Sequence, residues 1–105
     1  MTDGELLEAA AAAAAHDWQW FGEHFCIRGD AQSKVFSAWN PLASDAQALQ
    51  LAVLLGLEVD FEHDPICVGL CLSRHGVREP WGSDKLLAAR RAIVRAAAAM
   101  PAGDV

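Results

Sequence analysis

Two stretches of the chain alternate between apolar and polar residues, which is the period of a β-strand with one face in a core. Residues 57–64 read Leu-Glu-Val-Asp-Phe-Glu-His-Asp, and residues 66–73 alternate again after Pro65 ends the first stretch. Aromatic and β-favouring residues are also frequent between residues 17 and 39, on both sides of the turn-forming residues 29–33. These patterns predict two pairs of neighbouring antiparallel strands.

The first of three predicted helices runs from Asp3 to about Ala15 and is rich in alanine, the best helix former. Thr2 and Glu5 match a capping box, in which each side chain accepts a hydrogen bond from the other residue's backbone N–H. Leu6 and Leu7 are the only large apolar side chains of this segment. We therefore expect a marginal helix that contributes little to the core.

The central predicted helix begins near Pro41 and ends at Gly56, with Asn40 or Ser44 as its N-cap. Its large apolar side chains point in nearly all directions around the helix axis; they belong to Leu42, Leu49, Leu51, Val53, Leu54 and Leu55. A helix that is apolar all round is buried on more than one side. We expect most of these side chains to lie in the core.

A final helix is predicted after a loop over residues 74–82, with Ser83 as its N-cap and Pro101 beyond its end. The element order is then α-β-β-α-β-β-α. This order favours an α+β fold in which an antiparallel sheet of about four strands and three helices form a layered sandwich. No linker divides the chain, so residues 1–105 are expected to form a single domain.

The composition limits the functions and locations that we expect. A formal net charge of −6 argues against direct binding of nucleic acid, which relies on a basic surface. No apolar stretch is long enough to cross a bilayer, and acidic residues precede the alanine tract 9–15, which is not the pattern of a secretory signal. The three thinly spread cysteines are typical of free thiols in a reducing compartment. A cytoplasmic location without a membrane partner follows.

Four side chains of the types that bind zinc recur at every fourth residue, namely His63, Cys67, Cys71 and His75. Four residues of a strand cover about 13 Å, whereas two thiolates on one zinc ion lie within about 4 Å of each other, given bonds of about 2.3 Å. Pro65 and Gly69 would interrupt a helix that could bring these side chains together. We therefore predict no metal, no cofactor and no catalytic residue. A small metal-binding or thiol-dependent enzyme that uses these residues is the alternative.

The strand predicted over residues 57–64 would carry a row of acidic side chains on one face, about 7 Å apart along the strand. They are Glu58, Asp60, Glu62 and Asp64. Such a row is either a solvated face or a contact surface for a basic partner. Trp81 is either a plug at the edge of the core or an anchor for a partner. Arg91 and Arg95 are either the solvated side of an amphipathic helix, paired with carboxylates, or a phosphate site.

The segment Trp39-Asn40-Pro41-Leu42 and the later run Arg90-Arg91-Ala92-Ile93-Val94-Arg95-Ala96-Ala97 carry a family resemblance. Together the two helical segments resemble the small phage and prophage proteins of the phage alpha-beta-alpha sandwich family, which have no agreed biochemical role. The resemblance implies a sheet between helical layers. It also implies a phage accessory protein in the host cytoplasm that binds and inhibits a host macromolecule without catalysis, for instance an anti-CRISPR protein. The acidic row favours a host protein or nucleoprotein complex with a basic surface as the partner, and a homodimer remains open.

Overall fold

The computed structural model describes residues 1–28, 34–70 and 76–101. Its elements are α1 (Asp3–Ala13), β1 (Asp17–Phe21), β2 (His24–Arg28), β3 (Ser37–Ala38), α2 (Asp45–Leu55), β4 (Leu57–Asp60), β5 (Ile66–Leu70), β6 (Val77–Glu79) and α3 (Lys85–Ala98). The predicted α+β class is confirmed. The prediction of one four-stranded sheet is wrong, because the described strands form two antiparallel sheets, β1-β2-β3 and β4-β5-β6.

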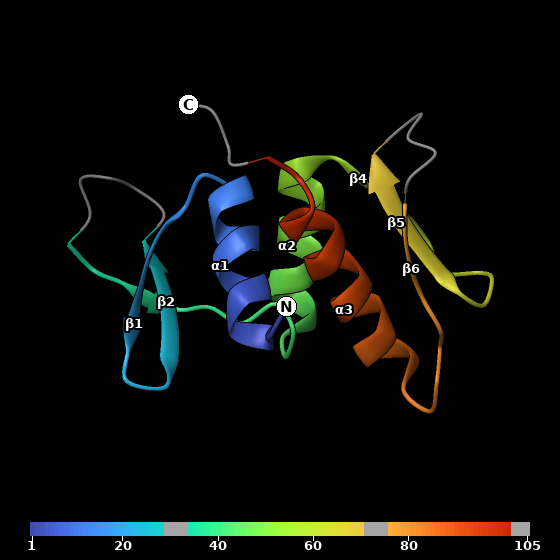
Figure 1. Cartoon of the computed structure of the whole chain (residues 1–105), viewed down its shortest axis with the longest axis horizontal. Coiled ribbons are helices and arrows are strands. Elements are labelled where there is room, and N and C mark those ends of the chain that lie inside the picture. Colours follow the sequence, from blue (N-terminus) through green and yellow to red (C-terminus); the bar gives the residue numbers. More distant parts are fainter. Residues whose placement is uncertain (29–33, 71–75, 102–105) are drawn as a thin grey trace.

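The three helices lie in the middle of the molecule, with one sheet on either side of them (Figure 1). Helix α1 contacts β1 and β2, whereas α3 contacts β4, β5 and β6. This arrangement reverses the expected layering, in which a sheet would lie between helices. Each small sheet has one apolar face to bury, and the helical layer is apolar enough to be covered from both sides.

The hairpin formed by β1 and β2 was not predicted. Phe21 and His24 are cross-strand partners, so Gly22 and Glu23 form a two-residue turn. Gly22 has a φ of 63°, a left-handed conformation that glycine adopts with little strain. The turn predicted at residues 29–33 falls outside the described residues.

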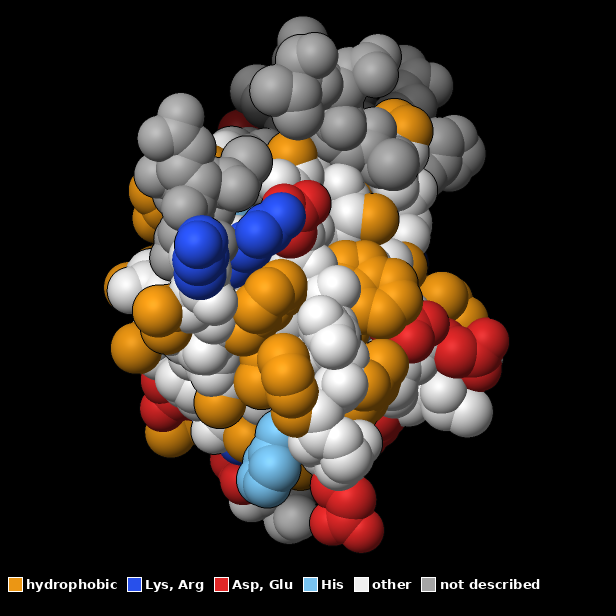
Figure 2. All heavy atoms as spheres, turned by 90° about the vertical axis from the view of Figure 1, so that its left-hand side faces the viewer, with side chains coloured by type: hydrophobic (Ala, Val, Ile, Leu, Met, Phe, Trp, Pro, Cys, Tyr) orange, Lys and Arg blue, Asp and Glu red, His pale blue; other side chains and the backbone are white. Residues whose placement is uncertain are grey.

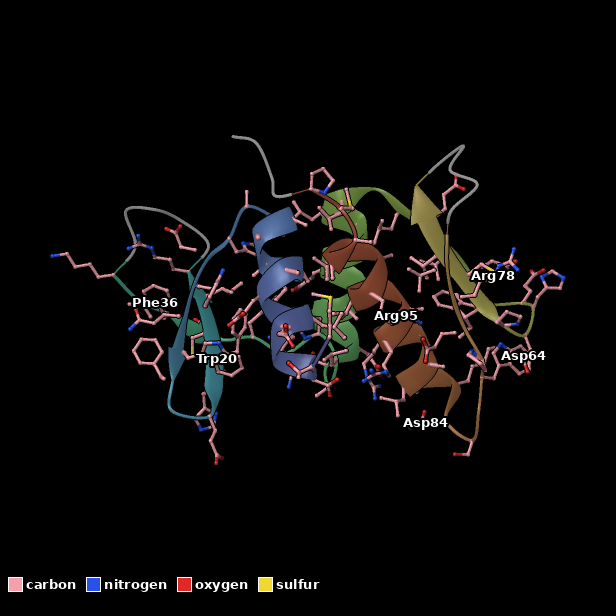
Figure 3. All side chains as sticks on the ribbon, viewed as in Figure 1. Trp20, Phe36, Asp64, Arg78, Asp84 and Arg95 are labelled. Atoms are coloured by element: carbon pink, nitrogen blue, oxygen red, sulfur yellow. The ribbon has the colours of Figure 1, made fainter. Side chains whose placement is uncertain are left out.

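The inner face of this first sheet is tied to α1 by an aromatic side chain. The rings of Trp20 and Phe25 meet edge to face, with 5.0 Å between their centroids. The indole N–H of Trp20 donates to a carboxylate oxygen of Glu8 in α1 over 2.8 Å, on the side of the hairpin that faces the helices (Figure 3). This contact fixes the hairpin against the helical layer.

In the second sheet, β4 ends at Asp60, four residues before the predicted end at Asp64. The strand β6 was not predicted, because its three residues lie within a stretch that has the composition of a loop. One cross-strand row of this sheet packs against the core through Val59, Val68 and Val77. Residues 71–73, the end of the second predicted strand, are outside the described part of the chain.

Helix α1 packs against α3 through small side chains. Ala10 and Ala11 of α1 and Ala92 and Ala97 of α3 are all completely buried. The expectation that α1 would contribute little to the core is wrong, because alanine side chains leave room for a close approach of the two helices. The capping box of Thr2 and Glu5 is confirmed.

Helix α2 begins at Ser44, whose side chain accepts a hydrogen bond from the backbone N–H of Gln47. Pro41 lies in the preceding turn, so the helix starts later than predicted. Gly56 ends the helix with a φ of 66° as expected. In α3 the N-cap is Asp84, one residue after the predicted Ser83.

The burial of α2 differs most from the prediction. Leu51 is 2% exposed, but Val53 is 73% exposed and Leu54 58% exposed. Only one stripe of the helix, Ala48, Leu51 and Ala52, is fully buried. The two sheets do not reach around α2, which leaves its other apolar side chains at the surface.

Candidate functional site

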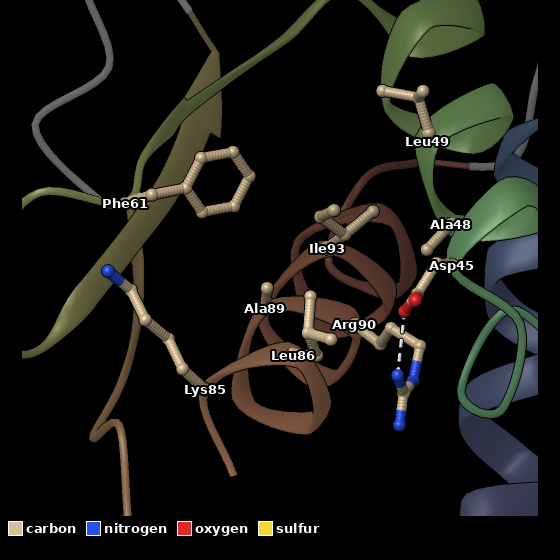
Figure 4. A pocket seen from close by; sticks show the side chains of 9 residues that line it. All are labelled: Asp45, Ala48, Leu49, Phe61, Lys85, Leu86, Ala89, Arg90 and Ile93. Atoms are coloured by element: carbon tan, nitrogen blue, oxygen red, sulfur yellow. Dashed lines mark hydrogen bonds and ion pairs between the residues drawn. The ribbon is translucent and has the colours of Figure 1, made fainter.

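An apolar groove runs over α3, between α2 and the turn that follows β4 (Figure 4). Its volume is about 300 Å³. The apolar side chains that line it are Ala48 and Leu49 from α2, Phe61 from the turn, and Leu86, Ala89 and Ile93 from α3. The groove therefore joins three segments that lie far apart in the sequence.

The rim of the groove exposes large apolar side chains. Leu49 is 63% exposed, Leu86 is 62% exposed and Phe61 is 46% exposed. Val53 lies one helical turn beyond Leu49 and continues the same ridge of α2. Large apolar side chains gathered around a groove are typical of a surface that another molecule covers.

The two cations at the groove already have partners. Arg90 donates from Nη1 to Oδ1 of Asp45 over 2.6 Å and from Nε to the carbonyl oxygen of Leu42 over 2.8 Å. The ammonium group of Lys85 lies 4.0 Å from the centroid of the Trp81 ring, a cation–π contact. Both cations of this mainly apolar groove thus have a partner within the fold: Arg90 a carboxylate and Lys85 an aromatic ring.

The predicted acidic row is not a straight row on a strand. Glu58 and Asp60 lie in β4, but Glu62 and Asp64 lie in the turn that follows it. Oδ1 of Asp60 accepts a hydrogen bond from the backbone N–H of Glu62 over 3.0 Å, which bends the chain away from the strand. Two of the four carboxylates therefore belong to the turn and two to the strand, and the chain between them places Phe61 in the groove.

The Asp60 carboxylate is stabilised in its charged form. The backbone N–H of Glu62 and then the ring of His63 hold the pKa of Asp60 below its usual value. Nδ1 of His63 is 3.1 Å from Oδ2 of Asp60. Asp60 thus serves to fold the turn.

Trp81 connects the acidic turn to the start of α3. Its indole N–H donates to the carbonyl oxygen of His63 over 2.9 Å, and its backbone N–H donates to Oδ1 of Asp64 over 3.1 Å. The ring is half-buried and packs against the core. Of the two roles considered for Trp81, this geometry favours the plug at the edge of the core.

Arg91 and Arg95 are engaged in ion pairs with other parts of the fold. Nη1 of Arg91 lies 3.2 Å from Oδ1 of Asp3 in α1. Arg95 forms an ion pair with Glu79 in β6 and donates to the carbonyl oxygen of Arg78 over 3.2 Å (Figure 3). These pairs tie α3 to α1 and β6, so they favour the interpretation of an amphipathic helix with paired charges over a phosphate site.

The candidate zinc ligands are only partly described. Cys71 and His75 fall outside the described residues, while His63 is exposed and Cys67 is a half-buried free thiol. Among the described residues, no group of three or more His, Cys, Asp or Glu side chains is placed to hold a metal ion. Nothing in this part of the chain brings the candidate ligands together.

A second apolar area lies on the outer face of the first sheet, where hydrophobic side chains gather in the middle of the view in Figure 2. Phe21 is 47% exposed, and its ring is 5.7 Å from the ring of Phe36. The guanidinium of Arg28 lies over Phe36 at 5.4 Å. Arg28 directly precedes residues 29–33 in the sequence, which lie outside the described part of the chain, and we assign no site to this area.

The groove was not predicted from the sequence. Leu49 was expected in the core because the central predicted helix is apolar all round. The signal that could have revealed the groove is the excess of large apolar positions on α2: Leu49 and Val53 form a second stripe beside Ala48 and Leu51. Small domains rarely have enough surrounding elements to bury two stripes of one helix.

No protein-family model matches the chain, and no curated protein or solved structure is significantly similar to it. The resemblance to the phage alpha-beta-alpha sandwich family therefore stays a prediction. Within the described residues, none of the helices is both long and apolar enough to traverse a bilayer.

Proposed function

We propose that this chain is a non-catalytic protein-binding domain, and that the apolar groove between α2 and the turn after β4 is its binding surface. The observation that carries the proposal is the exposure of large apolar side chains around a groove whose charged groups already have partners. In the specific form that the family resemblance favours, the bound partner is a host protein or nucleoprotein complex, and binding inhibits it, as an anti-CRISPR protein would.

The chemistry of the groove supports a polypeptide partner over a small polar substrate. Sites for small substrates combine an apolar lining with a few polar groups aimed at the ligand. The polar groups here, Asp45, Lys85 and Arg90, are instead directed at each other, at the Leu42 carbonyl or at Trp81. An apolar centre with charges at its border is the usual organisation of a protein–protein interface.

The size of the expected effect follows from the exposed side chains. Burying a leucine completely contributes about 1.5–3 kcal/mol, and Leu49 and Leu86 are each about two-thirds exposed. Covering them should therefore contribute about 1–2 kcal/mol each. Since about 1.4 kcal/mol is a tenfold change in affinity, losing both contacts should weaken binding at least tenfold.

The test is the affinity of matched variants for a partner isolated from host lysate and then purified. The double variant Leu49→Gln, Leu86→Gln should bind at least tenfold more weakly in biolayer interferometry. Leu54→Gln is the matched control, because Leu54 is equally large, 58% exposed and on the same helix, but does not line the groove. Unchanged affinity in the double variant, with normal folding, would contradict the proposal. For the anti-CRISPR form, the double variant should lose inhibition of target cleavage by the CRISPR effector complex, whereas Leu54→Gln should keep it.

A further inference from the structure

We propose that a second copy of the chain covers the groove in the free protein, and that the two copies form a symmetric dimer across a twofold axis. This inference rests on the proposed function, because it names what occupies the same surface before a host partner binds. Three observations support it: the two-sided layout of the groove, the placement of its accessible charges, and the size of its exposed apolar area.

A twofold dimer requires a surface that is complementary to itself. When two copies face each other across a twofold axis, a residue on one side of the axis meets a residue from the opposite side of the other copy. The groove has two such sides, with the α3 side chains between them (Figure 4). Phe61 and Lys85 lie on one side, and Leu49 and Asp45 lie on the other. An axis that runs along the floor therefore brings unlike sides together.

The two most accessible charges of the groove lining have opposite signs and lie on opposite sides. The side chain of Asp45 is 60% exposed, whereas that of its partner Arg90 is only 16% exposed. Lys85 is exposed, and its ammonium group lies over the Trp81 ring. In the twofold arrangement Asp45 of each copy faces Lys85 of the other, so two equivalent ion pairs form. This layout favours a second copy over a partner whose charge has a single sign.

The net charge of −6 opposes self-association only weakly at this surface. Residues 46–57 include no charged side chain, so the exposed side of α2 beyond Asp45 is neutral. Repulsion between carboxylates elsewhere on the two copies is screened over about 8 Å at physiological ionic strength. A chain with this net charge should associate with itself through its least charged surface, and α2 provides one.

The exposed apolar side chains cover one another in the same arrangement. Leu49 of each copy faces Phe61 of the other, and Leu86, between the two sides, lies near the axis. A fully exposed leucine or valine presents about 100 Å² of apolar surface, and a phenylalanine about 200 Å². With Val53, the exposed parts of these side chains amount to about 300 Å² in each copy.

This area predicts a weak dimer. Two copies bury about 600 Å² of apolar surface, which corresponds to about 900 Å² in total if about 65% of the interface is apolar, as in other homodimers. Interfaces of this size are at the small end of those that are specific. We therefore expect a dimer that dissociates on dilution, which frees the groove for the host partner.

The experiment measures the mass of the full chain by sedimentation equilibrium between about 5 and 500 μM, a range that suits the weak affinity of a small interface. Leu86→Gln tests the apolar centre, because twofold symmetry removes two contacts with one substitution. Leu54→Gln is its matched control, since it places the same amide at an exposed leucine that does not line the groove. Lys85→Glu tests the ion pairs. Circular dichroism verifies that each variant is folded.

We expect the wild-type chain to pass from monomer to dimer within this range, and Leu86→Gln to raise the dissociation constant at least tenfold. Leu54→Gln should leave the dissociation constant unchanged. Lys85→Glu should raise it several-fold, because like charges then face each other at two places. A wild-type chain that stays monomeric at the highest concentration would overturn the inference, as would a dimer that Leu86→Gln leaves intact. A dimer unaffected by Lys85→Glu would overturn the twofold arrangement.

These outcomes are separable from the proposed function. A chain that is monomeric at every concentration overturns the dimer alone. The proposed function fails only if the double variant Leu49→Gln, Leu86→Gln retains full affinity for the host partner. The two proposals therefore depend on different measurements.

Discussion

Two leucines of α2 that are separated by a single residue should respond very differently to the same substitution. Leu51 is 2% exposed and belongs to the core cluster, whereas Leu49 is 63% exposed at the groove. Leu51→Ala removes buried methyl groups and leaves a cavity, which should lower the free energy of unfolding by about 2–5 kcal/mol. Leu49→Ala removes mainly solvated groups, so its effect should stay below about 1 kcal/mol.

The comparison isolates burial from the other properties of the two sites. Both residues lie in the interior of the same helix, and leucine and alanine are both good helix formers, so the change in helix propensity nearly cancels. The difference of at least about 1–2 kcal/mol between the variants should lower the melting temperature of Leu51→Ala by several degrees more than that of Leu49→Ala.

Urea unfolding followed by far-UV circular dichroism measures both free energies. The slope of the unfolding free energy with urea should be the same for wild type and both variants, which shows that only stability has changed. If Leu49→Ala destabilises the chain as much as Leu51→Ala, the outer side of α2 is buried in solution. The groove would then be filled, and the proposed function would lose its basis.

Three further predictions concern other parts of the fold. Ala10→Leu should lower the free energy of unfolding by about 1–3 kcal/mol or more, because Ala10 is completely buried in the helical layer; an unchanged urea midpoint would refute the close contact. Gly56→Ala should lower the free energy of unfolding by about 1–2 kcal/mol in the same assay, because alanine is strained at a φ of 66°. Gly56→Asn should lower it less, since asparagine tolerates this conformation better. Equal losses in the two variants would argue against strain as the cause. Burial lowers the pKa of His16 below 6.5, so its stabilising contribution is complete above the unfolded-state pKa and is lost as the pH falls through the folded-state pKa. His16→Gln should therefore lose less stability than wild type between about pH 7 and pH 5, and an NMR titration that gives His16 a pKa above 6.5 would contradict the assignment.

Local signals in the sequence predicted the N-cap of α1 and the end of α2 correctly and gave Ser44 as one of two caps for α2. These signals are helix caps, whose hydrogen bonds reach no further than about one helical turn. The caps formed by Thr2 with Glu5, by Ser44 and by Gly56 therefore depend little on the rest of the fold. The tight turn at Gly22 was overlooked, because the aromatic residues on both sides of it read as one continuous β-favouring stretch. A glycine flanked by such residues is itself a hairpin signal.

The layering and the site depended on tertiary contacts that no local pattern contains. The apolar residues of α2 predicted burial on all sides, but a sequence does not state how far the neighbouring sheets extend, and Val53 and Leu54 are left exposed. The alternation of apolar and acidic residues predicted a strand that continues to Asp64. Instead, the Asp60 side chain accepts a hydrogen bond from the backbone N–H of Glu62, and the chain turns there. The same acidic segment still borders the proposed binding surface, by way of Phe61.

The central position of α3 has a consequence for how the molecule responds to a ligand. This helix forms the floor of the groove and also contacts α1, α2 and the second sheet. A ligand that binds only the folded chain adds RT ln(1 + [L]/Kd) to the free energy of every local or global unfolding event that disrupts its binding site. Openings that separate α1 from α3 and disturb the groove floor are then suppressed as well. Amide hydrogen exchange in α1, which contributes no residue to the groove, would therefore slow when the groove is filled.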